Sequence, residues 1–135
     1  RKLKPDILHI NNGGYPGALS GLAASVAGRV AGVPSVIMVV NNMAVGYTGV
    51  SRWFDYPIDW MVVRSVSLFI TGSKAARSRL LEILKLSPEK VCSVHNGISI
   101  PTLPHTDFSI RARLGLKEYE GAIFGVVAHL IPRKG

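Results

Sequence analysis

The stretch that decides the fold is residues 31–42, AGVPSVIMVVNN. Its centre, Ser35 to Val40, is a short apolar run rich in valine and isoleucine, which is typical of a buried strand. Gly32 and Pro34 stand just before this run and predict the end of a helix. Two asparagines follow the run and open a loop that extends to Gly49. The stretch therefore predicts a helix end, a buried strand and a loop, in that order.

Elements of the same two kinds lie on both sides of this stretch. We expect further buried strands over residues 7–10, 68–71, 91–94 and 122–127. We expect helices over residues 18–31, 58–66, 75–84 and 108–114, the third of them capped by Ser73. Short connections between alternating strands and helices predict an α/β fold with a Rossmann-like parallel sheet and flanking helices. The spacing in the first helix predicts a buried face made of Leu19, Leu22, Ala23, Val26 and Val30.

Composition sets limits on the class of protein. With 135 residues, 47% of them hydrophobic, the chain is long enough for one globular core. Its apolar blocks are too short to span a membrane or are interrupted by Arg64. A single cysteine, Cys92, excludes an internal disulfide and fits a reducing compartment. The formal charge of +8 favours anionic partners, but the basic residues are spread along the chain, which argues against nucleic acid.

Loops at the carboxyl ends of the strands are the expected ligand site, because parallel α/β sheets bind ligands there. Glycines in the first loop let backbone approach a ligand, although Pro16 removes an N–H that a phosphate cradle would use. A tight strand-to-helix turn explains these glycines equally well. Asn96-Gly97 is likewise a turn signal as well as a candidate for binding. The candidate residues on these loops are Gly13, Gly14, Tyr15, Asn41, Asn42, Ser73, Asn96 and Gly97.

Two other features have a simpler interpretation than a site. Asp55 and Asp59 are four residues apart, but Pro57 stands between them, and we interpret them as a solvated helix start. The segment RWFDYPIDWM, residues 52–61, could rest on lipid or hold an amphipathic acceptor. Packing in the core or against another domain is the preferred interpretation of its aromatic residues. No catalytic triad and no histidine spacing of a metal site is present in the sequence.

Taken together, several segments are similar to the retaining glycosyltransferases of family 4, which have the two-domain GT-B fold. The segments are KPDILHI (4–10), AGVP (31–34), LFITGS (68–73), KVCSVHNGI (90–98), IRARLGL (110–116) and VAHLIPRKG (127–135). The resemblance implies a fragment of such an enzyme. Residues 1–104 would be part of the N-terminal, acceptor-side Rossmann-like domain. Residues 105–135 would be the linker and the truncated start of the C-terminal nucleotide-sugar-binding domain.

The resemblance also implies an activity. The full protein would transfer a sugar from a nucleotide-sugar donor to a sugar, lipid-linked or small-molecule acceptor with retention of configuration, and the fragment alone would be inactive. It implies no metal or other cofactor and no nucleic acid partner. It implies a cytoplasmic location with peripheral association with an anionic membrane.

Individual residues carry part of this resemblance. Lys134 matches the family lysine that contacts the donor diphosphate, and His129 stands where the family usually has an arginine with the same role. Asn41 and Asn42 stand where family members commonly have a histidine, and an asparagine amide can hydrogen-bond sugar hydroxyls. Two alternatives stay open: a nucleotide-sugar epimerase of the same fold, and a non-catalytic module that binds nucleotides or nucleic acid.

Overall fold

The computed structural model of the chain describes residues 4–99, 110–116 and 120–121. The chain divides into two units, residues 1–98 and residues 99–135. In the described part of the second unit the only regular element is a short helix, α5 (Ile110–Arg113). It falls within the helix predicted for residues 108–114. The strand predicted over residues 122–127 lies outside the described residues.

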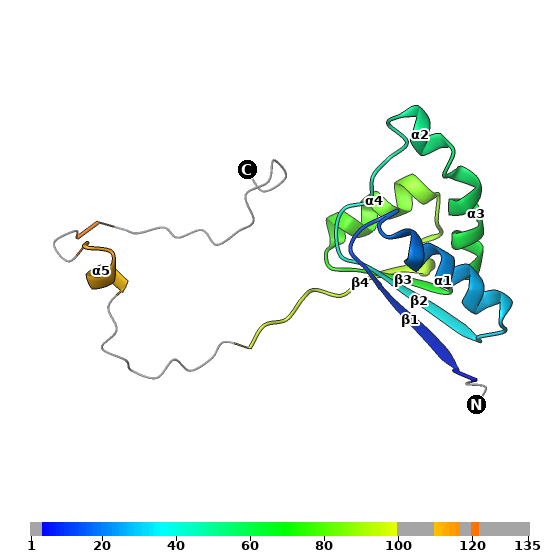
Figure 1. The fold of residues 1–135 in the computed structure, drawn as a ribbon, viewed down its shortest axis with the longest axis horizontal. Coiled ribbons are helices and arrows are strands. Elements are labelled where there is room, and N and C mark those ends of the chain that lie inside the picture. The colour runs from blue at the N-terminus through cyan, green and yellow to red at the C-terminus, as the bar shows by residue number, and fades with distance from the viewer. Residues whose placement is uncertain (1–3, 100–109, 117–119, 122–135) are drawn as a thin grey trace. The chain divides into compact units, whose positions relative to one another are not determined.

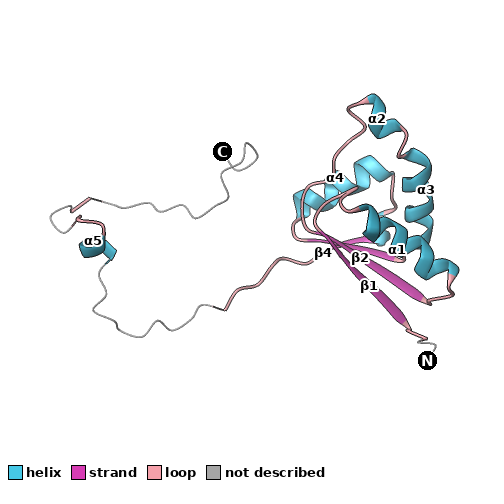
Figure 2. Cartoon of the chain, viewed as in Figure 1, coloured by secondary structure: helices cyan, strands magenta, loops and turns pink. Residues whose placement is uncertain are grey.

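The first unit alternates strands and helices, as predicted (Figure 2). Its four strands form one parallel sheet in the order β1-β2-β3-β4, and in its register Ile10 lies opposite Met38. The prediction of an α/β fold with a Rossmann-like parallel sheet and flanking helices is thereby confirmed. The elements are β1 (Ile7–Asn12), α1 (Leu19–Val30), β2 (Ser35–Val40), α2 (Val50–Trp53), α3 (Tyr56–Ser65), β3 (Leu68–Thr71), α4 (Lys74–Leu84), the 3₁₀ turn η1 (Pro88–Lys90) and β4 (Val91–Ser93).

The three long helices, α1, α3 and α4, all pack on one face of the sheet (Figure 1). Right-handed connections between strands added in one direction place the helices on that same side. Alternate residues of each strand therefore enter the core, while Ile37, Val39, Leu68 and Ile70 on the opposite face stay only half-buried. The core includes Ile10, Leu22, Val36, Met38, Val40, Val62, Phe69, Leu80 and Val91.

Helix α1 turns a different face inward from the one predicted. Leu22 is buried as expected, but Leu19 is 68% exposed and Val30 is 83% exposed. The buried stripe is Leu22, Ser25 and Gly28. A Cβ atom at Gly28 would lie 2.4 Å from Cδ2 of Leu8, so the Leu8 side chain packs directly against the helix at this glycine. Small residues at positions 25 and 28 therefore face the sheet in place of the predicted Leu19 and Val30.

Helix α4 is bounded as its sequence predicts. The Ser73 side chain accepts a hydrogen bond from the Ala76 amide at 3.1 Å, which is the expected N-cap. Leu80 and Leu84 are buried against the sheet. The helix ends at Lys85, whose φ of 51° is left-handed. Across the part of the chain that the structure describes, every helix is too short or too polar to cross a membrane.

Candidate functional site

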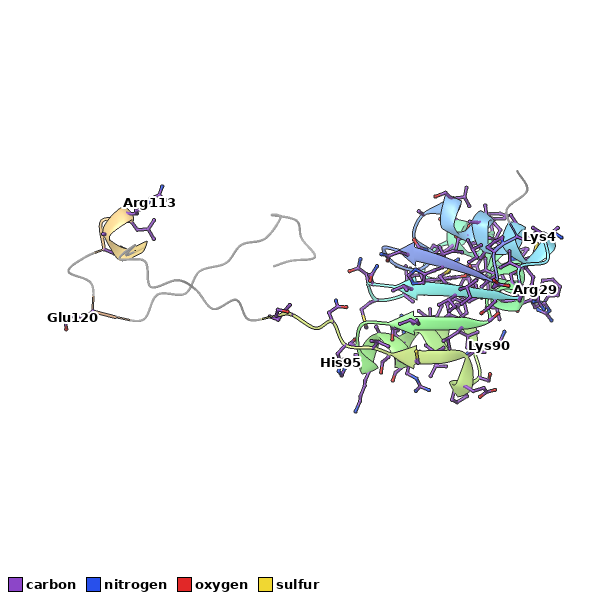
Figure 3. All side chains as sticks on the ribbon, turned by 90° about the horizontal axis from the view of Figure 1, so that it is seen from below. Lys4, Arg29, Lys90, His95, Arg113 and Glu120 are labelled. Carbon is purple, nitrogen blue, oxygen red and sulfur yellow. The ribbon has the colours of Figure 1, made fainter. Side chains whose placement is uncertain are left out.

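The carboxyl ends of the four strands share one edge of the sheet, and the predicted loops gather there. Figure 3 shows this for β4, where His95 lies at the loop end and Lys90 at the other end. Lys4 and Arg29 lie at the same end as Lys90, which is the amino edge of the sheet. The candidate residues follow the ends of the strands in the chain and therefore belong to the carboxyl edge.

The loop after β1 is held by a buried asparagine. The side chain of Asn12, 3% exposed, donates to the Pro16 carbonyl and accepts from the Ala18 amide, both at 3.0 Å. Gly17 has a φ of +67°, and a Cβ there would lie 2.4 Å from Oδ1 of Asn12 and 2.4 Å from the Gly14 carbonyl oxygen. Only glycine suits that position. The loop is therefore a tight strand-to-helix turn that Asn12 closes, and the turn itself explains the glycine at position 17.

The loops after β1 and β2 are joined to each other. The Asn41 side-chain amide donates to Oδ1 of Asn11 at 2.6 Å and to the Asn12 carbonyl at 3.0 Å. The side-chain amide of Asn42 donates to the Gly13 carbonyl. The Cβ of Asn42 is also close to Gly14, because a Cβ added at Gly14 would lie 3.6 Å from it. Four of the predicted residues, Gly13, Gly14, Asn41 and Asn42, therefore lie together. Both side-chain amides of the second loop are exposed and held in a fixed orientation.

The loops after β3 and β4 form a second, looser pair. Asn96 and Gly97 are exposed, and a Cβ at Gly72 would lie 3.9 Å from Nδ2 of Asn96. The hydroxyl of Ser73 is used as the cap of α4, so that it contributes to the fold rather than pointing freely into the edge. Of the predicted residues in this pair, Asn96 has an exposed polar side chain that makes no hydrogen bond within the described part of the chain.

Tyr15 points inward, away from the solvent side of its loop. Its ring is 1% exposed and packs edge-on against Phe69, with the ring centroids 6.5 Å apart. Its hydroxyl donates to Oδ1 of Asp59 at 2.9 Å. The side chain therefore anchors the first loop to helix α3, and only its backbone lies in the loop.

Asp59 is the centre of a buried polar cluster, so its interpretation as part of a solvated helix start is wrong. It is 3% exposed. Its Oδ2 accepts from the Tyr47 hydroxyl at 2.6 Å and pairs with Nη1 of Arg52 at 2.8 Å. The same Arg52 nitrogen pairs with Asp55 at 3.2 Å, and the guanidinium lies 4.6 Å from the centre of the Tyr47 ring. The cluster ties the loops after β1 and β2 to helices α2 and α3.

The cluster shifts the ionisation of its members. Burial, together with the charge of Asp59 and the hydrogen bond to it, raises the pKa of Tyr15 far above its ordinary value. Burial and the hydrogen bond to Asp59 also raise the pKa of Tyr47. Burial lowers the pKa of Arg52, but the charge of Asp59 and its hydrogen bond outweigh that effect, and the net pKa is raised. Both tyrosines therefore stay neutral donors and Arg52 stays a cation.

Other predicted features lie elsewhere or outside the described residues. Lys134 and His129, predicted to contact the donor diphosphate, belong to the residues that the structure does not describe. The aromatic residues of the 52–61 segment are not in the core: Trp53 is 61% exposed and Trp60 is 51% exposed. Within the described ranges, histidine, cysteine and acidic side chains form no group able to hold a metal ion.

A comparison with protein families identifies the chain. The model described as Glycosyltransferase Family 4 matches residues 1–100, which is most of the sequence. The chain therefore belongs to Glycosyltransferase Family 4. Neither a curated protein nor a solved structure matches it.

Proposed function

We propose that this chain forms the acceptor side of an enzyme that transfers a sugar from a nucleotide-sugar donor to an acceptor with retention of configuration. Its membership of Glycosyltransferase Family 4 supports a transferase. The observation that carries the acceptor role is the pair Asn41 and Asn42, exposed at the carboxyl edge and fixed against the loop after β1.

Fixed amides suit a ligand rich in hydroxyl groups. Each asparagine side chain has one acceptor oxygen and two amide donors. The amide of Asn41 already donates to Asn11 and Asn12, so that its orientation is set before a ligand arrives. Within the described residues no donor pairs with the side-chain oxygen of either Asn41 or Asn42. These oxygens can accept hydrogen bonds from acceptor hydroxyls without rearrangement of the loop.

The donor side of the proposal depends on residues that the structure does not describe. Lys134 would place its ammonium against the donor diphosphate and stabilise the charge that develops as the glycosidic bond breaks. His129 would be a second contact to the diphosphate. The boundary between the two domains would lie near residue 104. No metal is needed in this scheme, and the enzyme would work in the cytoplasm, in peripheral contact with an anionic membrane.

The test uses the complete polypeptide that contains this chain. It is incubated with nucleotide-sugars and candidate acceptors, and the anomeric configuration of the product is read by NMR. Retention of the donor configuration is expected, while an inverted product would contradict the proposal. An epimerised nucleotide-sugar formed without an acceptor would favour the epimerase. Nucleotide binding with no turnover of any donor would favour a non-catalytic module.

A variant locates the acceptor. Asn41→Ala should raise the KM for the acceptor several-fold and leave the KM for the donor unchanged, because it removes a hydrogen-bonding group on the acceptor side only. An equal effect on both KM values would remove Asn41 from the acceptor site. Residues 1–135 alone should show no turnover.

A further inference from the structure

The loops after β1 and β2 are uncharged. Residues 11–17, at the end of β1 and in the loop after it, contain no aspartate, glutamate, lysine, arginine or histidine, and neither do residues 41–49 after β2. At the chain's average of 18% charged residues, these sixteen positions would carry about three charged side chains. The chain as a whole has a formal charge of +8. The loops that hold Asn41 and Asn42 therefore differ in charge from the rest of the molecule.

Positive charge gathers at the opposite, amino edge of the sheet. Each long helix returns the chain from the carboxyl edge to the amino edge, so its last turn lies at the amino edge. Arg29 and Arg64 are in the last turns of α1 and α3, and Lys85 ends α4. Lys4 and Lys90 precede β1 and β4, and Figure 3 shows both at the same end of the sheet as Arg29. These five cations therefore lie at the edge that does not carry the acceptor-side asparagines.

The buried cation beneath the two loops is already paired. Arg52 lies 2.8 Å from Asp59 and 3.2 Å from Asp55. Asp59 in turn accepts from the hydroxyls of Tyr15 and Tyr47, one from each loop. The cluster thus contains two carboxylates for one guanidinium. It leaves no surplus of positive charge for an anion that arrives at the described part of these loops.

Other charged side chains at the carboxyl edge are paired or belong to the other two strands. Arg79 approaches the loop after β2, because a Cβ at Gly46 would lie 3.2 Å from its Nη2. Its Nη1 pairs with Glu82 at 2.9 Å. Lys74 begins α4 after β3, and His95 follows β4. Among the described residues, no lysine, arginine or histidine side chain bonds to the two acceptor-side asparagines.

The orientation of the two amides decides which groups they can bind. A backbone carbonyl can only accept a hydrogen bond, so the Asn12 carbonyl fixes the amide nitrogen of Asn41 toward the first loop. The Gly13 carbonyl does the same for Asn42. Both N–H groups of Asn41 are used, the second of them on Asn11. The side-chain oxygens therefore point away from that loop, and a ligand group that meets them has to donate a hydrogen bond.

The free oxygens and the missing charges together restrict the chemistry of the acceptor. A sugar hydroxyl can donate to the side-chain oxygens, whereas a carboxylate has no proton to donate and would lose its water without gaining a counter-charge. We propose that the acceptor group bound at Asn41 and Asn42 is an uncharged sugar and that a sugar acid is rejected there. The inference rests on the proposed function, because it takes these loops as the acceptor side. Net charge alone predicts the reverse preference, since a chain of +8 attracts anions.

The test compares sugars that differ only in charge. The complete polypeptide that contains this chain is titrated with the methyl glycosides of glucose, galactose and mannose, each beside its uronate and its uronamide. The uronate has a carboxylate at C6, and the uronamide has nearly the same shape without the charge. Dissociation constants are measured by ligand-observed NMR, and turnover is measured with a nucleotide-sugar donor. For the sugars that bind, the uronate should bind at least about thirtyfold more weakly than the neutral glycoside, and the uronamide should stay within about fivefold of it.

Matched variants separate the local charge from the net charge. Met43 follows Asn42 in the loop and is 54% exposed, so Met43→Lys adds one cation beside the amides. This variant should strengthen binding of the uronate a few-fold and leave binding of the neutral glycoside unchanged. Val30→Lys adds the same charge at an 83% exposed site at the end of α1, on the amino edge, and should change neither. Circular dichroism confirms that each variant is folded.

Three results would overturn the inference. The first is a uronate that binds as tightly as its neutral partner, or more tightly. The second is an equal gain in uronate binding from Met43→Lys and Val30→Lys, which would make net charge the cause. The third is the absence of binding by every neutral glycoside. Turnover of a uronate acceptor with retention would leave the transferase standing and remove this inference, whereas neutral glycosides that bind without turnover of any donor would leave the inference standing and remove the transferase.

Discussion

Replacing Asp59 with alanine should be among the most destabilising changes in this domain. The carboxylate accepts from the Tyr15 hydroxyl at 2.9 Å and from the Tyr47 hydroxyl at 2.6 Å, and it pairs with Arg52 at 2.8 Å. Arg52 is 8% exposed, and its Nε and Nη2 atoms are buried without a hydrogen-bond partner in the described structure. The guanidinium therefore depends on Asp59 for most of its compensation.

The expected cost follows from what Asp59→Ala leaves behind. Removing one member of a buried ion pair costs about 3–5 kcal/mol, because the remaining charge is uncompensated. The orphaned Tyr15 hydroxyl is also buried and adds to this cost, although the two effects are not additive. We expect a loss of about 4 kcal/mol, which is a large share of the roughly 5–15 kcal/mol that stabilises a typical domain. The melting temperature should fall by at least about 15 °C.

The assay is urea and thermal unfolding of residues 1–135, followed by circular dichroism. Asp55→Ala is the matched control: Asp55 pairs with the same Arg52 nitrogen at 3.2 Å, but its side chain is 39% exposed, so the cost should be about 0–1 kcal/mol. The double change Arg52→Met with Asp59→Leu should be less harmful than Asp59→Ala, since no charge is left buried. Equal and small losses for Asp55→Ala and Asp59→Ala would refute the role of this cluster.

Three further predictions concern other parts of the chain. Gly17→Ala should lower the free energy of unfolding by more than about 2 kcal/mol, because φ at Gly17 is +67° and the new Cβ would lie 2.4 Å from Oδ1 of Asn12. Gly13→Ala is the control: nothing lies within 4 Å of its new Cβ, and it should cost less than about 1 kcal/mol. Because the folded-state pKa of Tyr15 is raised, the stabilisation that Tyr15 provides is complete below about pH 10 and should fall by about 1.4 kcal/mol per pH unit above it. Tyr15→Phe should therefore reduce the slope of stability against pH in alkaline unfolding and leave only the smaller part due to Tyr47, whose pKa is also raised. In the complete enzyme, Lys134→Ala should lower turnover about a hundredfold and Arg133→Ala much less, so that equal, mild losses would remove the specific role of Lys134.

The positions of strands β1 to β4 along the chain could be predicted because each one is a short apolar run with its own local boundaries. The predicted ranges for β2 and β3 agree with the structure at both ends. Strand β1 runs two residues further than predicted, through Asn11 and Asn12, because the polar side chains there find hydrogen bonds in the loops. A polar residue in a strand is hard to foresee from composition, since its partners lie at other positions in the chain.

The buried cluster could not be predicted for the same reason. Asp59 is one turn into a helix behind Pro57, which in isolation is a solvated position. Its partner Tyr15 is 44 residues away along the chain and Tyr47 is 12 residues away. Only the parallel sheet, which brings the loops after β1 and β2 to one edge, places these three side chains together. Each of the two loops carries a tyrosine, Tyr15 in the first and Tyr47 in the second, whose hydroxyl needs a hydrogen-bond partner if it is buried. The sequence alone does not indicate that this partner is Asp59.

The burial of Asp59 and the exposure of Tyr56 and Trp60 have the same cause, which is the register of helix α3. In a helix, fixing Asp59, Val62 and Ser65 toward the core forces the residues at positions 56, 60 and 64 outward, because these positions lie on the other side. The register of α3 that allows the carboxylate to hold Tyr15 and Tyr47 therefore also presents Tyr56 and Trp60 to solvent. Tyr47 belongs to both, because its hydroxyl contacts Asp59 while its ring packs against Trp53. The exposed rings and the loops after β1 and β2 are consequently anchored to the same carboxylate, so that a change at Asp59 would disturb both.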